Sequence, residues 1–109
     1  MTGTVLCRAD DIGEGAARGF VIGTGTARRD IVVVRSAGVL RAYLNACPHQ
    51  GTPLETFENR FLNEDATLLV CSTHGARFRV ENGFCVSGPC AGKSLSAIAC
   101  RIEDGNVVV

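Results

Sequence analysis

The stretch Cys-Pro-His at residues 47–49 and the stretch Cys-Ser-Thr-His at residues 71–74 contain both histidines of this 109-residue chain. Each stretch offers one thiolate and one imidazole, and both groups bind transition metals. An apolar segment precedes each cysteine, and a glycine follows each histidine within two residues. The pattern predicts two loops, each at the end of a strand, which together hold one metal centre through Cys47, His49, Cys71 and His74.

Short runs of alternating apolar residues, separated by Gly, Asn-Gly or Asp-Gly, recur along the rest of the chain. No stretch keeps a helical period for the length of a helix, so the sequence predicts an all-β fold. Tight hairpin turns are expected at Asn82-Gly83 and Asp104-Gly105, where positive φ is easily reached. The predicted strands are Val5 to Arg8, Gly19 to Ile22, Ile31 to Arg35, Val39 to Asn45, Leu68 to Cys71, Arg77 to Val80, Phe84 to Val86, Ser96 to Ala99 and Val107 to Val109.

Length and net charge limit the classes of protein to which this chain can belong. A chain of 109 residues is expected to form a single domain over residues 1–109. Eleven basic and eleven acidic residues give zero net charge, which supplies no field for drawing in nucleic acid or an anionic membrane. No apolar run approaches membrane-spanning length, and the first residues do not form a secretion signal. We therefore expect a cytoplasmic protein whose six cysteines are not a disulfide scaffold.

The two stretches together resemble the ligand signature of the Rieske 2Fe-2S proteins, in which two His and two Cys hold one cluster. The likeness extends over residues 45–54 and 70–78. It implies the Rieske iron-sulfur fold, with three stacked antiparallel sheets and one 2Fe-2S cluster held by two loops of a small subdomain. It also implies that Cys47, His49, Cys71 and His74 are the ligands. Residues 87–89 resemble the third loop of the family, which makes Pro89 a shielding residue.

The resemblance implies an electron-transfer ferredoxin that passes single electrons from a flavin-dependent reductase to a terminal oxygenase. A mononuclear iron oxygenase needs two further histidines and a carboxylate, and no histidine remains once His49 and His74 are used, so the chain is expected not to be catalytic alone. Thr52 and Thr73 stand where respiratory and photosynthetic members have disulfide-forming cysteines, which favours the soluble dioxygenase type. Ala76 stands near where high-potential members have a serine hydroxyl, which predicts a potential of about −150 mV.

Three alternatives stay open at this point. One alternative to the ferredoxin is a small Rieske subunit of a larger oxidoreductase such as a nitrite reductase. Two Cys and two His also suit a zinc-stabilised interaction module, although zinc fingers usually pair their cysteines in one segment. The third alternative is an all-thiolate cluster of Cys47, Cys71, Cys85 and Cys90, in which neither histidine would bind the metal.

The segment between the two stretches is longer than in most members of the family. The charged run from Phe57 to Asp65 predicts a solvated excursion, with Phe57 or Phe61 folded back as an anchor. A surface loop tolerates such an insertion at small cost. Cys7 and Cys100 lie in apolar segments near the chain ends and are expected to be small core residues.

Overall fold

The structure is a computed structural model that describes residues 4–48, 54, 61–63, 67–71 and 75–109. The described residues form ten strands and two short 3-10 helices, η1 (Ala9–Asp11) and η2 (Gly25–Ala27). The strands are β1 (Val5–Arg8), β2 (Ala17–Ile22), β3 (Arg29–Ser36), β4 (Val39–Leu44), β5 (Leu68–Val70), β6 (Arg77–Arg79), β7 (Cys85–Ser87), β8 (Ala97–Ile98), β9 (Arg101–Glu103) and β10 (Asn106–Val108).

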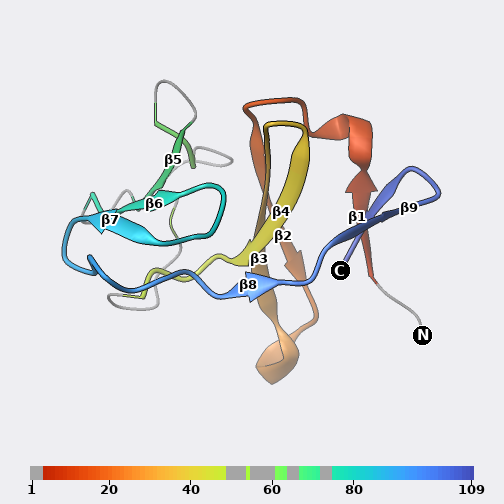
Figure 1. The fold of residues 1–109 in the computed structure, drawn as a ribbon. Coiled ribbons are helices and arrows are strands. Elements are labelled where there is room, and N and C mark those ends of the chain that lie inside the picture. The colour runs from red at the N-terminus through yellow and green to blue at the C-terminus, as the bar shows by residue number, and fades with distance from the viewer. Residues whose placement is uncertain (1–3, 49–53, 55–60, 64–66, 72–74) are drawn as a thin grey trace.

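The strands form three antiparallel sheets (Figure 1). The central sheet has the order β2-β3-β4-β8, and the two outer sheets have the orders β1-β10-β9 and β5-β6-β7. In Figure 1 the sheet β5-β6-β7 and the sheet β1-β10-β9 lie on opposite sides of the central sheet. The all-β fold that the sequence pattern predicted is confirmed, and so are the three antiparallel sheets that the family resemblance implied. None of the helices in the described residues has the length and apolar character needed to cross a membrane.

Strand β3 shows how the central sheet separates two cores. Successive side chains of a strand point to opposite faces. Accordingly Ile31 and Val33 belong to the core shared with β10, whereas Val32 and Val34 belong to the core shared with β5, β6 and β7. All four side chains are buried, with at most 1% of their surface exposed. The uninterrupted apolar run in β3 is therefore explained by burial on both faces of the sheet.

Two of the hairpins turn through pairs of residues with positive φ. Asp104 and Gly105 have φ of 52° and 77° between β9 and β10, and Ala37 and Gly38 have φ of 53° and 76° between β3 and β4. Positive φ at both central residues is typical of the type I′ turn, whose twist matches that of the strands. The predicted turn at Asp104-Gly105 is confirmed. At the other predicted turn, Gly83 has φ of 74° between β6 and β7, as expected.

The observed strands differ from the predicted ones mainly at their ends. Asn45, Cys71 and Val80 were predicted inside strands but lie just beyond β4, β5 and β6. These three residues are buried. Their burial, and not pairing within a strand, explains why the sequence pattern extended the predicted strands to include them. The strand β9 was missed, because all three of its residues are exposed and only its pairing with β10 defines it.

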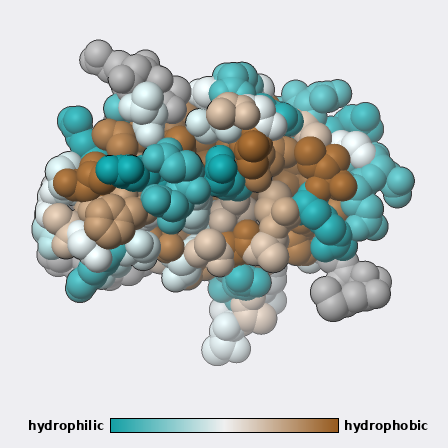
Figure 2. Space-filling model, viewed as in Figure 1, coloured by the Kyte–Doolittle hydropathy of each residue, from teal (hydrophilic) through white to brown (hydrophobic). Residues whose placement is uncertain are grey.

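Large apolar side chains that remain exposed are distributed over all three sheets. The described examples are Val5, Val21, Val39, Phe84, Val86 and Ile102. Figure 2 shows the same mixture on one face, where apolar brown surface is interrupted by hydrophilic teal. Apolar side chains scattered in this way are normal on a protein surface and do not by themselves mark a binding site.

Candidate metal centre

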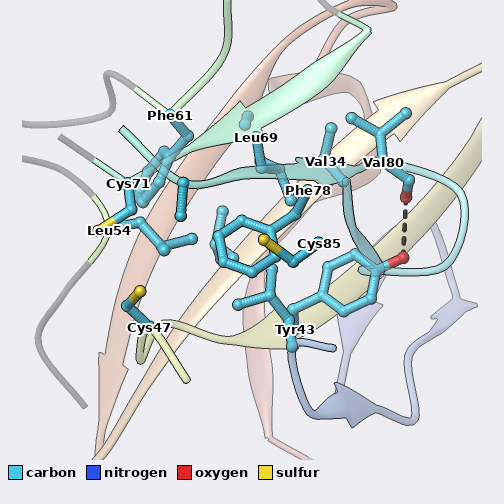
Figure 3. Packing of buried hydrophobic residues seen from close by; sticks show 14 of the residues in the cluster. Val34, Tyr43, Cys47, Leu54, Phe61, Leu69, Cys71, Phe78, Val80 and Cys85 are labelled. Carbon is cyan, nitrogen blue, oxygen red and sulfur yellow. Dashed lines mark hydrogen bonds between the residues drawn. The ribbon is translucent and has the colours of Figure 1, made fainter. Parts of the chain in front are cut away.

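The two cysteines of the predicted ligand set lie in one buried cluster. Cys71 follows β5 directly, and Cys47 follows β4 after two residues. Their exposed fractions are 0% and 1%, and both belong to the core between the central sheet and β5-β6-β7. Figure 3 shows Cys47 and Cys71 at the same edge of this core, with Leu54 beside them. His49 and His74 lie outside the described residues.

A buried asparagine holds the two ends of the first ligand loop. The backbone N–H of Asn45 donates to the carbonyl oxygen of Asp30 at 2.8 Å, which fixes the end of β4 against the start of β3. Its side-chain Oδ1 accepts a hydrogen bond from the backbone N–H of Leu54, also at 2.8 Å. Asn45 precedes Cys47 and Leu54 follows the loop, so this hydrogen bond joins the two ends of the loop formed by residues 46–53. The sequence reasoning missed this role, although a polar residue at the end of an apolar strand was a usable signal.

The second ligand loop is closed by two backbone hydrogen bonds. The N–H of Cys71 donates to the carbonyl oxygen of Ala76, and the N–H of Gly75 donates to the carbonyl oxygen of Cys71, each at 2.8 Å. Gly75 has φ of 73°, a conformation that glycine adopts without strain. Gly75 therefore permits the tight turn at the base of this loop. The loop is narrow at its base, and its cysteine faces the core.

A third loop, residues 88–92, packs against the second. Gly88 has φ of 97°, and a Cβ added to it would lie 2.6 Å from the Cα of Ala76. The two backbones therefore touch at a point where no side chain fits. Pro89, to which the resemblance gave a shielding role, is exposed beside this contact.

Cys85 and Cys90 place two more sulfur atoms in the same core. Their Sγ atoms are 3.4 Å apart, and Cys85 Sγ is 3.1 Å from the carbonyl oxygen of Ser87. Burial raises the pKa of the Cys90 thiol to about 12, with further contributions from Cys85 and from Cys47. Cys90 therefore keeps its proton at neutral pH.

The cysteine arrangement does not support the all-thiolate alternative. All six cysteines lie in the described part of the chain, and none of them is in a disulfide. No three His, Cys, Asp or Glu side chains among the described residues are grouped so that they could hold a metal ion. Two buried thiols, Cys47 and Cys71, at the ends of separate strands are nevertheless the donors that the sulfur-ligated iron of a mixed cluster requires. The donor set fits a cluster completed by two further ligands.

The long segment between the two ligand stretches is anchored where it rejoins the sheet. Phe61 is 1% exposed within the core, and its carbonyl oxygen accepts a hydrogen bond from the N–H of Val70 at 2.7 Å. The side chain of Asn63 accepts hydrogen bonds from the N–H groups of Thr67 and Leu68, both at 3.0 Å. Of the two anchors that the sequence offered, Phe61 takes the role in the structure, and Phe57 lies outside the described residues.

The family model described as "Rieske [2Fe-2S] domain" matches residues 2–102. The chain belongs to this family. It therefore carries a Rieske-type 2Fe-2S cluster with two Cys and two His ligands. This assignment favours iron and sulfur over the zinc-stabilised module that the ligand types alone left open.

The known proteins with similar sequences or structures include ferredoxins. The chain is 29% identical over 104 residues to the ferredoxin component of the alkene monooxygenase system of Xanthobacter autotrophicus (strain ATCC BAA-1158 / Py2), covering 95% of this chain and 77% of the relative. The ferredoxin of carbazole 1,9a-dioxygenase from Nocardioides aromaticivorans IC177 has a TM-score of 0.74 and 19% identity, covering 100% and 97% of the two chains.

A further solved structure contains a ferredoxin together with an oxygenase. One chain of the complex of reduced oxygenase and oxidized ferredoxin in carbazole 1,9a-dioxygenase has a TM-score of 0.76 and 23% identity to this chain. The match covers 98% of this chain and 91% of that chain. At these identities the two solved structures establish the shared fold.

Proposed function

We propose that Cys47, His49, Cys71 and His74 are the four ligands of the cluster. The two cysteines are buried in one core at the ends of β4 and β5, so each can present its sulfur from the protein side. Each histidine follows its cysteine within three residues, and the chain has no other histidine. The family requires two His, so the composition supports this assignment without a competing choice.

The function that these residues support best is that of a ferredoxin, an electron carrier that is not catalytic alone. The cluster, when bound, takes up and releases one electron. The chain itself buries the cysteine sulfurs, closes the ligand loops through backbone hydrogen bonds, and packs a third loop against the second. The observation that carries the proposal is the placement of both cysteines in one core of a chain whose residues 2–102 match the family.

The partners follow by likeness to the related proteins. The relative from Xanthobacter is named as the ferredoxin component of a monooxygenase system, and one similar structure pairs a ferredoxin with an oxygenase. We infer that this chain receives single electrons from a flavin-dependent reductase and delivers them to a terminal oxygenase. The proposal includes a single domain over residues 1–109 and a cytoplasmic location. A small subunit of a nitrite reductase-like oxidoreductase is the second candidate, and it differs in its electron acceptor.

Electron delivery tests this proposal directly. The purified protein is reduced anaerobically by one electron and mixed in a stopped-flow instrument with the oxidised terminal oxygenase isolated from the same organism. We expect reoxidation with one electron transferred per cluster, and no oxidation of the aromatic or alkene substrate by the ferredoxin alone. Substrate turnover without the oxygenase would contradict the proposal. Electron transfer to a nitrite reductase but not to the oxygenase would favour the second candidate.

A further inference from the structure

The outer face of the sheet β5-β6-β7 carries two arginines next to the second ligand loop. In β6 the middle residue, Phe78, is buried in the core, and Arg77 and Arg79 on either side of it are exposed. Side chains two positions apart on a strand share a face, so both arginines point away from the core, with about 7 Å between their backbone positions. Arg77 directly follows Ala76, whose carbonyl oxygen accepts a hydrogen bond from the N–H of Cys71 at 2.8 Å. The two charges therefore lie on the strand that leaves the ligand loop.

Apolar side chains lie beside the two arginines on the same face. Leu68 in β5 pairs with Arg79 and is half-buried. Val70, which directly precedes the ligand cysteine, pairs with Arg77 and is also half-buried. On the other side of Arg79, Phe84 accepts a hydrogen bond from the N–H of Arg79 at 2.9 Å through its carbonyl oxygen, and it is 40% exposed. These five residues form what we call the arginine face, and arginine and aromatic side chains are enriched where proteins bind one another.

Neither arginine of this face forms an ion pair with another described residue. The ion pairs of the described residues lie elsewhere, between Arg28 and Asp30 and between Arg101 and Glu103. Glu81, the carboxylate nearest to the face in the sequence, lines a depression together with residues of β4 and β8, so it faces the central sheet. The whole chain has no net charge. A local excess of positive charge, and not the field of the whole molecule, is therefore available to orient a partner.

We propose that the arginine face is a docking surface for an acidic, partly apolar patch on the terminal oxygenase. The inference rests on the proposed function, because it takes this chain as a ferredoxin. A guanidinium group can bind one carboxylate through two parallel hydrogen bonds. Arg77 and Arg79 therefore fit two carboxylates about 7 Å apart on the partner, with Phe84 in contact with the apolar part of the patch. Docking here places the partner against the strand that adjoins the loop of Cys71.

Stopped-flow electron transfer from the reduced holoprotein to the oxidised oxygenase of the same organism tests the proposal. Arg77→Gln and Arg79→Gln each remove one charge, and we expect each to lower the second-order rate constant by about 1.5- to 5-fold at low salt, as for the loss of one exposed ion pair. The double variant should be slower than either single variant. Arg101→Gln is the matched control, because it removes the same charge from an exposed position in β9, on the opposite side of the central sheet (Figure 1). Its rate constant should equal that of the wild type.

The salt dependence of the same reaction gives a second readout. Salt screens exposed charges, and the screening length falls from about 10 Å at 0.1 M to about 3 Å at 1 M. The wild-type rate constant should fall as salt is added, and that of the double variant should fall less, so that the two converge at high salt. The variant with Arg77→Lys and Arg79→Lys keeps both charges and should keep the wild-type salt dependence. A wild-type rate constant that does not fall with salt would overturn the proposal.

Two further outcomes would also overturn it. Several carboxylates between residues 55 and 65 lie outside the described residues, so the variants are also compared by urea unfolding. We expect no change, because both arginines are exposed; a clear loss of stability would show that they pair within the chain. If the double variant accepts electrons from the reductase more slowly but delivers them to the oxygenase at the wild-type rate, the acidic partner is the reductase.

Failure of this inference differs from failure of the proposed function. No electron transfer from the wild-type protein to the oxygenase would contradict the proposed function itself. Normal transfer in the wild type, with the same rate constant in the double variant at low salt, would leave the ferredoxin assignment standing and remove only the arginine face.

Discussion

The contact between the third loop and the second ligand loop predicts a large difference between two glycine substitutions. Gly88 and Gly92 lie in the same loop after β7, with φ of 97° and 91°. Any L-residue with a side chain is strained at such φ, at a cost of about 1–3 kcal/mol. At Gly92 the new Cβ would meet nothing within 4 Å, whereas at Gly88 it would lie 2.6 Å from the Cα of Ala76.

The clash adds a second cost at Gly88 alone. Cβ atoms do not approach backbone atoms to 2.6 Å, so the third loop must move away from Ala76. Forcing extra atoms into a packed site costs typically about 1–3 kcal/mol. Gly88→Ala should therefore be less stable than Gly92→Ala by about 1–3 kcal/mol, with the conformational strain cancelling between the two variants.

Urea unfolding of the holoprotein under anaerobic conditions, with matched cluster content, measures the difference. The rate at which each variant loses its cluster to an iron chelator gives a second readout, because displacement of the third loop opens the core beside Cys47 and Cys71. We expect Gly88→Ala to lose its cluster faster than Gly92→Ala. Equal stability and equal rates of cluster loss in the two variants would show that the third loop is not held against Ala76.

Further predictions concern single contacts around the site. Asn45→Ala should cost about 1–3 kcal/mol and speed cluster loss, because the buried N–H of Leu54 loses its acceptor, whereas Asn45→Asp keeps an acceptor and should be milder in the same assays. Tyr43→Phe should cost a similar amount in urea unfolding, because the Tyr43 hydroxyl donates to the carbonyl oxygen of Val80 at 2.8 Å (Figure 3). Burial raises the pKa of Tyr43 above 10.0, so the folded state holds the hydroxyl proton more tightly than the unfolded state does. The resulting contribution to the free energy of unfolding is fully present below about pH 10 and is lost as pH rises through the folded pKa. The stability of the Phe variant should not show this loss at alkaline pH. Ala76 offers no hydroxyl to the cluster, so redox titration should give a potential near the low end of the Rieske range, about −150 mV; a clearly positive potential would contradict this.

Much of the fold was predictable because its signals are local. The paired positive-φ turn at Asp104-Gly105 needs only two residues to define it, and the apolar run of β3 shows directly in the sequence. The strand β9 was not predictable from its own residues, because they are all exposed and its pairing with β10 makes it a strand.

The candidate site also has features that the sequence predicts and features that only the fold reveals. The ligand types were predictable because Cys47 and Cys71 stand beside histidines in the sequence. The packing of the third loop against Ala76 was not, because it depends on how a distant loop folds back. The hydrogen bond from Leu54 to Asn45 joins two residues nine positions apart. A polar residue at the end of an apolar strand was a signal for Asn45, but no spacing rule indicates which backbone N–H it accepts from.

The EPR spectrum of the dithionite-reduced, purified protein tests the central claim most directly. A cluster with mixed His and Cys ligands gives a lower average g than an all-cysteine cluster, and a zinc protein gives no signal. We predict the mixed-ligand spectrum in the wild type and its loss in both His49→Ala and His74→Ala. An all-cysteine spectrum, no signal, or a spectrum unchanged by either substitution would contradict the assignment of a Rieske centre to these four residues.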